Sequence, residues 1–355
     1  MTTAFATFPV TKVSESKLKT TDFNNLVFGK HFTDYMLEAD YDNGEWVNVE
    51  IKPYQPISFY PSMAALHYGQ AIFEGIKAYK HADGSAYIFR PYDNFKRFNI
   101  SAKRMQMPEV PEEIFMDGLR QLVKLERDWI PTKQDYSLYI RPVMFATDEV
   151  IGVHPSNSYK FFILLSPTGF YYGAPMKILV EETYTRAAPG GVGFAKNAGN
   201  YGASLQAAQK AKEMGYDQVL WTDAFEHKWL QEVGTMNVFF VIDNVAITPP
   251  LHEGTILAGI TRDSAIQILN DMGLEVEERN ISIDELIAAY EAGKYIEAFG
   301  TGTAATVSYI KELRYKDDSM YFDTAKWKVA PELRKRVNDI REGRAQDIYG
   351  WLMAI

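Results

Sequence analysis

A lysine placed between two clusters of glycines is the strongest chemical signal in this sequence. Over residues 190–202 glycine occupies five of thirteen positions, Lys196 lies between the clusters, and Tyr201 follows five residues later. Glycines allow positive φ angles and the close approach of a second group. Burial disfavours the ammonium form of a lysine, and the neutral amine can form a Schiff base with an aldehyde. We therefore predict that Lys196 carries pyridoxal phosphate; the competing interpretation is a glycine-rich surface loop with a solvated lysine.

A phosphorylated cofactor needs anion-binding positions, which backbone N–H groups at glycine turns and helix N-termini supply. Two such places follow Lys196: residues 257–263, where Thr261 lies near an expected helix start, and the small-residue turn 300–306. Arg97 can add a forked guanidinium to a phosphate. Each feature also has an ordinary explanation, because threonine often caps a helix and arginine often lies on a solvated helix face.

A carboxylate, Glu232, comes shortly before a very apolar segment, residues 238–242. A carboxylate is expensive to bury there unless a cation lies beside it. The protonated nitrogen of a pyridine ring is such a cation, and its proton makes the ring a better electron sink. We expect Glu232 to hold that nitrogen; the alternative is a solvated loop glutamate, since glutamates are mostly exposed.

The composition narrows the class of protein. A length of 355 residues with 46% hydrophobic residues suits two domains, and a net charge of −9 argues against a nucleic-acid binder. The chain has no cysteine, which excludes disulfides and thiolate chemistry, and its six scattered histidines form no HxxxH pair, so we expect no metal site. We find no signal-peptide pattern and no apolar run of about 18 residues, and we therefore expect a cytoplasmic protein that does not cross a membrane.

The rest of the chain must position these groups, and its patterns predict strands and helices throughout. A helix is expected after Pro91, which suits a first helical turn, with Asn94 as a candidate cap, and another helix is expected from Pro111. A hairpin is expected from residues 71–79 and 85–89. The other strands expected in the first half are 34–41, 46–51, 136–145 and 159–165.

In the second half the pattern changes after residues 171–175, a candidate linker that contains glycine and proline. We expect an N-terminal α/β domain over residues 1–172 and a C-terminal α/β domain over residues 173–355 that carries the lysine. The helices expected in the second domain, each closed by a glycine, are 203–214, 261–272 and 283–292, and the strands are 176–180, 218–221, 238–242 and 295–299.

Several motifs occur in an order that resembles the branched-chain amino-acid aminotransferases, a family of fold type IV pyridoxal-phosphate enzymes. The resemblance runs nearly end to end and implies two α/β domains with the active site at the domain interface, and a homodimer. Its motifs are Val27-Phe28-Gly29, Phe73-Glu74-Gly75, Arg141-Pro142-Val143, Gly199-Asn200-Tyr201-Gly202, Glu232-Val233-Gly234-Thr235-Met236-Asn237 and Thr248-Pro249-Pro250, followed by a C-terminal tryptophan region.

The resemblance implies a role for each matching residue. Lys196 matches the Schiff-base lysine, Tyr201 matches the tyrosine that hydrogen-bonds the phenolic oxygen of the cofactor, and Glu232 matches the partner of the pyridine nitrogen. The implied phosphate binders are Arg97, Ile260, Thr261 and Thr303. The implied substrate-pocket residues are Tyr68, Phe73, Tyr139, Arg141, Tyr171, Thr235 and Ala304, with Val153 where a neighbouring subunit reaches into the pocket.

The activity implied is reversible amino-group transfer between leucine, isoleucine or valine and 2-oxoglutarate, so the expected partners are small amino acids and 2-oxo acids. Some mammalian members carry a CxxC redox switch after the small-residue turn, but Ala305 and Ser308 stand at those positions here. The rival functions are another fold type IV enzyme, a D-amino-acid aminotransferase or an aminodeoxychorismate lyase, and a non-catalytic binding protein on an enzyme scaffold. The set of Lys196, Tyr201 and Glu232 argues against the last of these.

Overall fold

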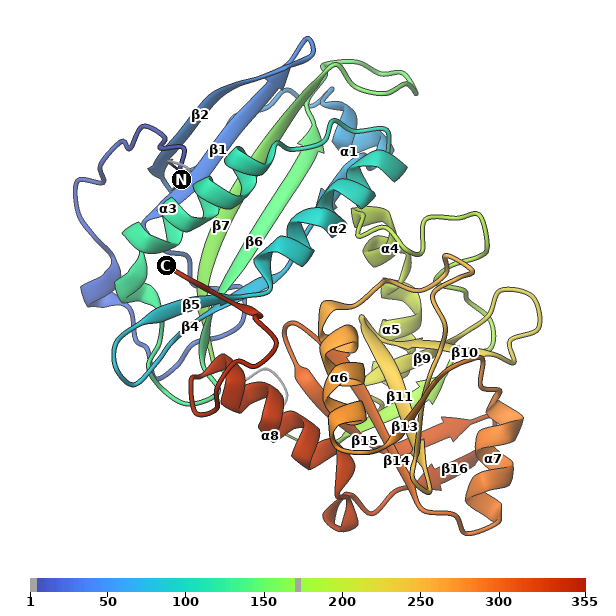
Figure 1. Ribbon diagram of the computed structural model, residues 1–355. Helices are drawn as coiled ribbons and strands as arrows, with labels where there is room; N and C mark the ends of the chain where they lie inside the picture. The colour runs from blue at the N-terminus through green and yellow to red at the C-terminus, as the bar shows by residue number, and fades with distance from the viewer. Residues whose placement is uncertain (1–4, 170–173) are drawn as a thin grey trace. The chain divides into compact units, whose positions relative to one another are not determined.

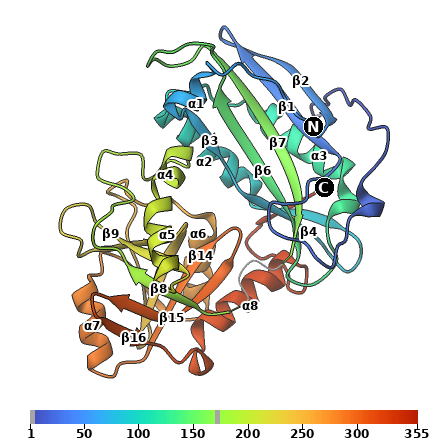
Figure 2. The same ribbon diagram turned by 180° about the vertical axis from the view of Figure 1, so that it is seen from behind.

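The computed structural model describes residues 5–169 and 174–355 (Figure 1, and from behind in Figure 2). The chain forms two compact units, each with its own sheet. Unit 1 comprises Met1–Tyr171, Ala195–Ala198 and Ile340–Ile355, and unit 2 comprises Tyr172–Phe194 and Gly199–Asp339. Tyr171 and the expected domain boundary between residues 172 and 173 lie outside the described residues.

Unit 1 is built on a sheet whose strands all pair antiparallel. The strands are β1 (Tyr35–Asp42), β2 (Glu45–Pro53), β3 (Ala71–Phe73), β4 (Ile76–Lys80), β5 (Ala86–Phe89), β6 (Ser137–Ala146), β7 (Ser158–Thr168) and β17 (Leu352–Ala354). Their order is β17-β5-β4-β6-β7-β1-β2, with β3 beside β6. The predicted hairpin is confirmed as β4 and β5, whereas β3 separates from β4 and pairs with β6.

Helices cover one face of this sheet, where α2 (Pro91–Arg104) and α3 (Gly118–Leu125) lie side by side (Figure 1). A π-helical segment, Glu113–Asp117, leads into α3, and the core beneath is aromatic. The rings of Phe98, Phe115 and Phe161 lie 5.5 to 5.8 Å apart by their centroids and join the helical layer to β7. The remaining helical segments of unit 1 are α1 (Ala64–Tyr68) and the 3₁₀ turns Leu18–Thr20 and Arg127–Trp129.

One prediction about α2 is confirmed and one is wrong. Pro91 is the first residue of the helix, where its missing N–H costs no hydrogen bond. Asn94 is not the cap, because the residue before the helix is Arg90. Instead Asn94 is buried inside the first turns, and its amide donates to Glu74 at 2.7 Å.

Unit 2 is built on a nine-stranded sheet of mixed direction. Its strands are β8 (Met176–Val180), β9 (Gln218–Thr222), β10 (Leu230–Val233), β11 (Met236–Ile242), β12 (Val245–Thr248), β13 (Glu275–Glu278), β14 (Ile296–Gly302), β15 (Thr306–Tyr315) and β16 (Asp318–Tyr321). Their order is β10-β9-β8-β15-β14-β11-β12-β13, and β10 also pairs with β11. That extra pairing closes β10, β9, β8, β15, β14 and β11 into a ring, so these strands form a barrel.

The core of unit 2 explains the apolar run at residues 238–242. Every residue of β11 is buried, and the ring of Phe239 stacks on that of Phe299 in β14 at 5.4 Å. A strand buried on both faces needs such a continuous apolar sequence. The helical segments of this part of the chain are α4 (Ala198–Ala203), α5 (Leu205–Glu213), α6 (Ile260–Asp271), α7 (Ile283–Glu291), the 3₁₀ turn Thr324–Lys326 and α8 (Val329–Arg341), which ends in unit 1.

The helices expected in unit 2 are confirmed in position. α5 packs on β9, and α6 packs on β13 and β14 (Figures 1 and 2). After the helices the chain turns at Gly215, Gly273 and Gly293, all with positive φ. Within the described ranges no helix combines the length and apolarity needed to cross a bilayer, and no three His, Asp or Glu side chains are grouped to hold a metal ion.

Candidate functional site

Lys196 lies on a short segment that is anchored to the sheet of unit 1. The carbonyl of Lys196 accepts from the N–H of Phe73 at 3.1 Å, and Asn197 forms a bridge with Ile72 of β3. The N–H of Lys196 donates to the hydroxyl of Ser101 in α2 at 2.9 Å. The backbone of the lysine is therefore held between β3 and α2, which limits where its side chain can reach.

The side chain of Lys196 is half-buried, so it is neither a solvated surface lysine nor a fully shielded one. Its Nζ lies 4.9 Å from the centroid of the Phe73 ring, a distance typical of a cation–π contact. The segment of Lys196 is thus tied to β3 and α2 and is not a free surface loop. What surrounds the amine is an aromatic ring and, close by, the charge of Glu74.

Glu74 is fully buried and forms a two-pronged ion pair with Arg97. Nε and Nη2 of Arg97 donate to its two oxygens at 2.7 and 2.8 Å, and the amide of Asn94 donates at 2.7 Å. Burial alone raises the pKa of the Glu74 carboxyl, but the charge and hydrogen bonds of Arg97, and then the charge of Lys196, outweigh it and hold that pKa below its usual range. Glu74 is therefore an ionised carboxylate beside the lysine.

Arg97 is buried in this ion pair and does not lie on a solvated helix face. A guanidinium carries five donors in a planar fork, so pairing with Glu74 through Nε and Nη2 is compatible with a phosphate contact. The phosphate role of Arg97 stays a prediction. The sequence motif contained Glu74, but nothing in the local pattern showed that it would meet an arginine 23 residues later.

Three of the predicted substrate residues come together on the strands of unit 1. Nη2 of Arg141 donates to the hydroxyl of Tyr139 at 3.0 Å, and its guanidinium carbon lies 4.6 Å from the centroid of the Phe73 ring. A Cβ at Gly75 would come within 2.3 Å of the Tyr139 hydroxyl, so this glycine is required for the tyrosine to lie there. The cluster combines aromatic faces with one cation, a lining suited to a ligand with an apolar part and a carboxylate.

Two further predicted residues lie at exposed positions of unit 1. Tyr68 ends α1 and is 40% exposed, and Val153 lies in the loop between β6 and β7 and is 87% exposed. Ile151 in the same loop is 77% exposed. Tyr171 lies outside the described residues.

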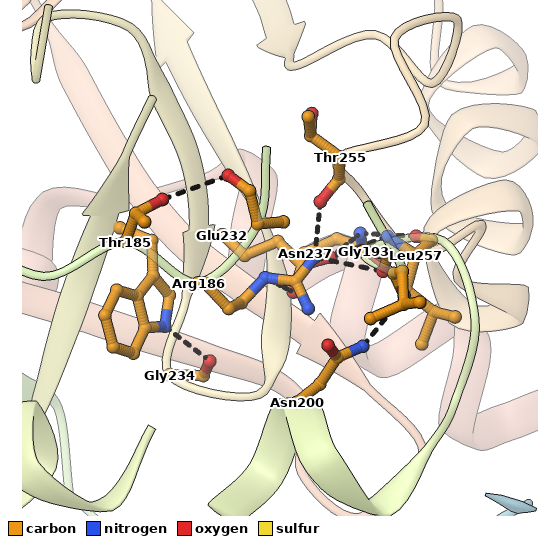
Figure 3. A network of polar contacts seen from close by, with 12 residues as sticks. Thr185, Arg186, Gly193, Asn200, Glu232, Gly234, Asn237, Thr255 and Leu257 are labelled. Atoms are coloured by element: carbon orange, nitrogen blue, oxygen red, sulfur yellow. Dashed lines mark hydrogen bonds and ion pairs between the residues drawn. The ribbon is translucent and has the colours of Figure 1, made fainter. Parts of the chain in front are cut away.

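Glu232 lies in β10 with only 3% of its surface exposed, so the solvated-loop alternative is excluded. Its Oε1 accepts from the N–H of Leu257 at 2.8 Å, and Oε2 forms an ion pair with Nε of Arg186 at 3.2 Å. The amide of Asn237 lies 3.5 Å from Oε1 and donates at 2.9 Å to the carbonyl of Leu257 (Figure 3). The carboxylate is thus oriented by the main chain, a side-chain amide and a guanidinium.

Arg186 was missed by reasoning from the sequence, and it ties three segments of unit 2 together. Besides Glu232, its Nη2 donates to the carbonyls of Gly193 at 3.2 Å and Thr255 at 2.5 Å (Figure 3). A Cβ at Gly193 would lie 2.6 Å from the Thr255 carbonyl oxygen, so these two loops meet only because residue 193 is a glycine. The only available signal was a lone arginine shortly before the glycine-rich stretch.

The start of α6 has the geometry that an anion site requires. The helix begins at Ile260, and Gly259 precedes it in an extended conformation that supplies no side-chain cap. Thr261 is therefore not a helix cap, and both Ile260 and Thr261 are buried. A Cβ at Gly259 would lie 1.9 Å from Oδ1 of Asn237, so only glycine allows the helix start and the Glu232 network to be this close.

The small-residue turn is shorter than predicted. Gly300 and Gly302 belong to β14, and the turn is confined to residues 303–305, between β14 and β15. A Cβ at Gly300 would lie 2.8 Å from the end of the Met236 side chain, which explains the small residue there. Thr303 and Ala304 are half-buried in the turn, and Thr235 is exposed in the turn between β10 and β11.

These groups fit pyridoxal phosphate by their chemistry. An anchored lysine amine can hold an aldehyde, a buried and oriented carboxylate suits a protonated ring nitrogen, and the N-terminus of a helix suits a phosphate. Lys196 and Arg97 belong to unit 1, while Tyr201, Glu232, Ile260, Thr261 and Thr303 belong to unit 2.

Sequence comparisons connect this chain with enzymes of one kind. The family model described as amino-transferase class IV matches residues 71–313. A probable branched-chain-amino-acid aminotransferase of Staphylococcus epidermidis is 50% identical over 347 residues, which cover 96% of each chain. Branched-chain-amino-acid transaminase 1 of Bacillus subtilis is 48% identical over 340 residues, 94% of this chain and 95% of the relative.

Solved structures of the same kind share the fold. The branched-chain amino acid aminotransferase of Escherichia coli matches with a TM-score of 0.74 and 28% identity, over 90% of this chain and 98% of that one. The branched-chain amino acid aminotransferase of Thermobaculum terrenum, solved in its PLP-form, matches with a TM-score of 0.73 and 25% identity, over 92% and 99% of the two chains.

Proposed function

The chain belongs to the class IV aminotransferases, and we infer that it is a branched-chain-amino-acid transaminase that uses pyridoxal phosphate. The family expected from the sequence motifs is thereby confirmed, as is its fold class of two α/β domains of fold type IV. The reaction moves an amino group reversibly between L-leucine, L-isoleucine or L-valine and 2-oxoglutarate. Relatives near 50% identity along almost the whole chain support this substrate class.

When bound, pyridoxal phosphate supplies an aldehyde that takes up the amino group and a protonated ring that accepts negative charge. Lys196 would hold the aldehyde end and move the proton at the substrate Cα as general base and acid. The anchoring of its backbone by Phe73 and Ser101 supports this role, because the amine must lie within hydrogen-bond reach of the substrate Cα to move its proton.

Glu232 would keep the ring nitrogen protonated, and its network supports that role. A carboxylate that accepts a main-chain N–H and pairs with Arg186 stays oriented without relying on solvent. Tyr201 would hydrogen-bond the phenolic oxygen, and the phosphate would be held by Arg97, Ile260, Thr261 and Thr303. The position of Ile260 and Thr261 in the first turn of α6 supports their part, because the N-terminus of a helix favours an anion.

The substrate pocket must accept a branched apolar side chain and also the second carboxylate of glutamate. Phe73 and Tyr139 offer aromatic surface to the branched side chain. The Arg141 guanidinium lies beside both rings and can pair with the second carboxylate of glutamate. Size alone discriminates weakly, since one methylene is worth about 1–3 kcal/mol. We assign Tyr68, Tyr171, Thr235 and Ala304 to the same pocket, with Thr303 and Ala304 facing the substrate carboxylate.

We further propose that the enzyme acts as a cytoplasmic homodimer in which the loop of Val153 approaches the neighbouring subunit. The high exposure of Ile151 and Val153 supports this, because exposed apolar side chains gathered on one loop favour a protein interface.

The function is supported by two observations, one in each unit: the backbone of Lys196 is anchored in unit 1, and Glu232 is buried and oriented by the main chain in unit 2. Borohydride reduction of the holoenzyme, followed by peptide mapping, is expected to place the cofactor on Lys196. Assays with L-leucine, D-alanine and aminodeoxychorismate separate this function from the other fold type IV activities, and we expect turnover with L-leucine. Label on another residue, or turnover only with one of the other two substrates, contradicts the assignment.

A further inference from the structure

A hollow lies in unit 2, lined by the turn between β9 and β10 and by the loop that precedes α6. Its volume is about 220 Å³, and Gln231 of β10 lines it. The residues that line this hollow include neither Glu232 nor any other residue assigned to the cofactor, so it is a different place from the proposed cofactor site.

The charge that lines this hollow is negative. Asp223, Glu226 and Glu253 contribute carboxylates, and the described lining residues include no lysine, arginine or histidine. Asp223 is held by four main-chain N–H groups at 2.8 to 3.0 Å. Burial raises the pKa of its carboxyl, but these hydrogen bonds outweigh that effect and keep the pKa low. At neutral pH the lining thus favours a cation.

An amide provides the second and independent observation. Gln231 is only 5% exposed, and its Oε1 is buried without a hydrogen-bond partner among the described residues. A buried polar atom without a partner costs about 1–3 kcal/mol, so a donor that reaches this oxygen from the hollow would stabilise the protein. An amide oxygen needs a donor, and a protonated amine is a strong one.

Aromatic rings complete the lining. Trp229 and Phe225 belong to it, and Phe225 is 78% exposed. The Trp229 ring already attracts one ammonium group, since Nζ of Lys228 lies 5.2 Å from the ring centroid. Tryptophan faces bind organic cations more strongly than other rings do, and their apolar surface also accepts methyl or methylene groups.

We propose that this hollow binds a small organic ammonium ion, with its charge facing the carboxylates of Glu226 and Glu253, its N–H directed to Gln231, and its carbon atoms against Trp229. A bare metal ion is a poorer occupant, because the described residues group no three acidic or histidine side chains for coordination and two walls are aromatic. An anion is disfavoured by the lining charge.

The test uses the holoenzyme and trimethylammonium chloride as the probe. As a tertiary amine the probe carries one N–H donor and cannot condense with the cofactor aldehyde. Titration calorimetry at pH 8 is expected to give saturable binding of one ion per chain. Tert-butanol, of similar shape but uncharged, is expected to give no saturable binding. Absence of saturable trimethylammonium binding, or equal binding of the two probes, overturns the proposal.

Variants locate the site. Glu253→Gln is expected to weaken trimethylammonium binding roughly threefold, whereas Glu291→Gln, an exposed glutamate of α7 outside the lining, leaves it unchanged. Gln231→Met is expected to weaken binding while the melting temperature stays the same or rises, because the amide oxygen that it removes is buried without a partner among the described residues. Binding that survives both Glu253→Gln and Gln231→Met overturns the assignment to this hollow.

Discussion

Two buried glutamates, each paired with an arginine, are held in different ways in the two units. Glu74 in unit 1 receives two parallel hydrogen bonds from Arg97, at 2.7 and 2.8 Å. Glu232 in unit 2 receives a main-chain N–H at 2.8 Å, while the Nε of Arg186 stands at 3.2 Å in an ion pair.

The difference shows what each carboxylate does. The two-pronged pair commits both oxygens of Glu74 to a guanidinium, so its function is to balance the buried charge of Arg97 and to place negative charge near Lys196. The main chain fixes the position of Glu232, and Arg186 fixes the loops around it. Glu74 therefore supports the site through charge balance, and Glu232 suits direct contact with a cation.

The largest effect is expected at Lys196, whose charge lies near Glu74. Lys196→Ala removes the amine that holds the cofactor and moves the proton, and we expect turnover of L-leucine to fall by about 10⁴-fold or more. Steady-state kinetics measures the loss, and circular dichroism checks that the fold is retained. Normal turnover in a folded variant refutes the role of Lys196.

We expect that neutralising Glu74 lowers the free energy of unfolding more than any other single change in the two glutamate–arginine pairs. Glu74→Gln leaves the Arg97 charge buried without its counter-ion, and we expect a loss of about 3 kcal/mol in the free energy of unfolding at pH 7. The double variant Glu74→Met with Arg97→Met removes both charges. In urea unfolding it is expected to recover much of the stability that Glu74→Gln loses. Equal stability of Glu74→Gln and wild type contradicts the charge-balance role.

The pH dependence of stability provides a second test of the pair formed by Glu74 and Arg97. The pKa of Glu74 is lower in the folded state than the ordinary glutamate value of 4.5. Its contribution to the free energy of unfolding is therefore present above pH 4.5 and is lost as the pH falls through the lowered pKa. The stability difference between wild type and Glu74→Gln is therefore expected to shrink below about pH 4.5. A difference that is constant from pH 7 to pH 3 would contradict this.

For Glu232 we expect a loss in the rate of the reaction and little loss of stability. Glu232→Gln removes the charge that keeps the ring nitrogen protonated, and we expect single-turnover proton transfer to slow about 10²-fold while cofactor binding weakens far less. The main-chain N–H of Leu257 can still donate to the glutamine oxygen, so the melting temperature tests whether structure is kept. Unchanged single-turnover rates count against the pyridinium role.

A third buried carboxylate, Glu126, gives the smallest expected effect. Burial raises the pKa of Glu126 to about 7, although the main-chain N–H of Tyr35 donates to it. A raised folded pKa means that stability is lost as the pH rises from about 4.5 to 7, since the folded state must give up a proton it holds tightly. Glu126→Gln is therefore expected to gain about 1–3 kcal/mol over wild type at pH 8 but little at pH 4. A gain in stability that does not change with pH would show that the raised pKa of Glu126 is not its cause.

Much of this protein could be predicted from local sequence. The apolar run of β11 identifies a strand buried on both faces, Pro91 identifies the first turn of α2, and the glycines after α5, α6 and α7 identify their ends. Lys196 could be proposed as the cofactor-binding lysine as well, because a lysine between glycine clusters and the order of the motifs are both properties of the linear chain.

Tertiary structure decided the partners of the charged groups, and it did so because those partners are far apart in sequence. Asn94 had the pattern of a helix cap but binds Glu74, and Arg97 pairs with the same carboxylate across the face of the sheet. No local pattern pointed to Arg186, which meets Glu232 and Thr255 only because unit 2 closes its strands into a ring. The sequence determined which residue types were available for the chemistry, and long-range packing, which sets burial and charge pairing, decided the surroundings of each.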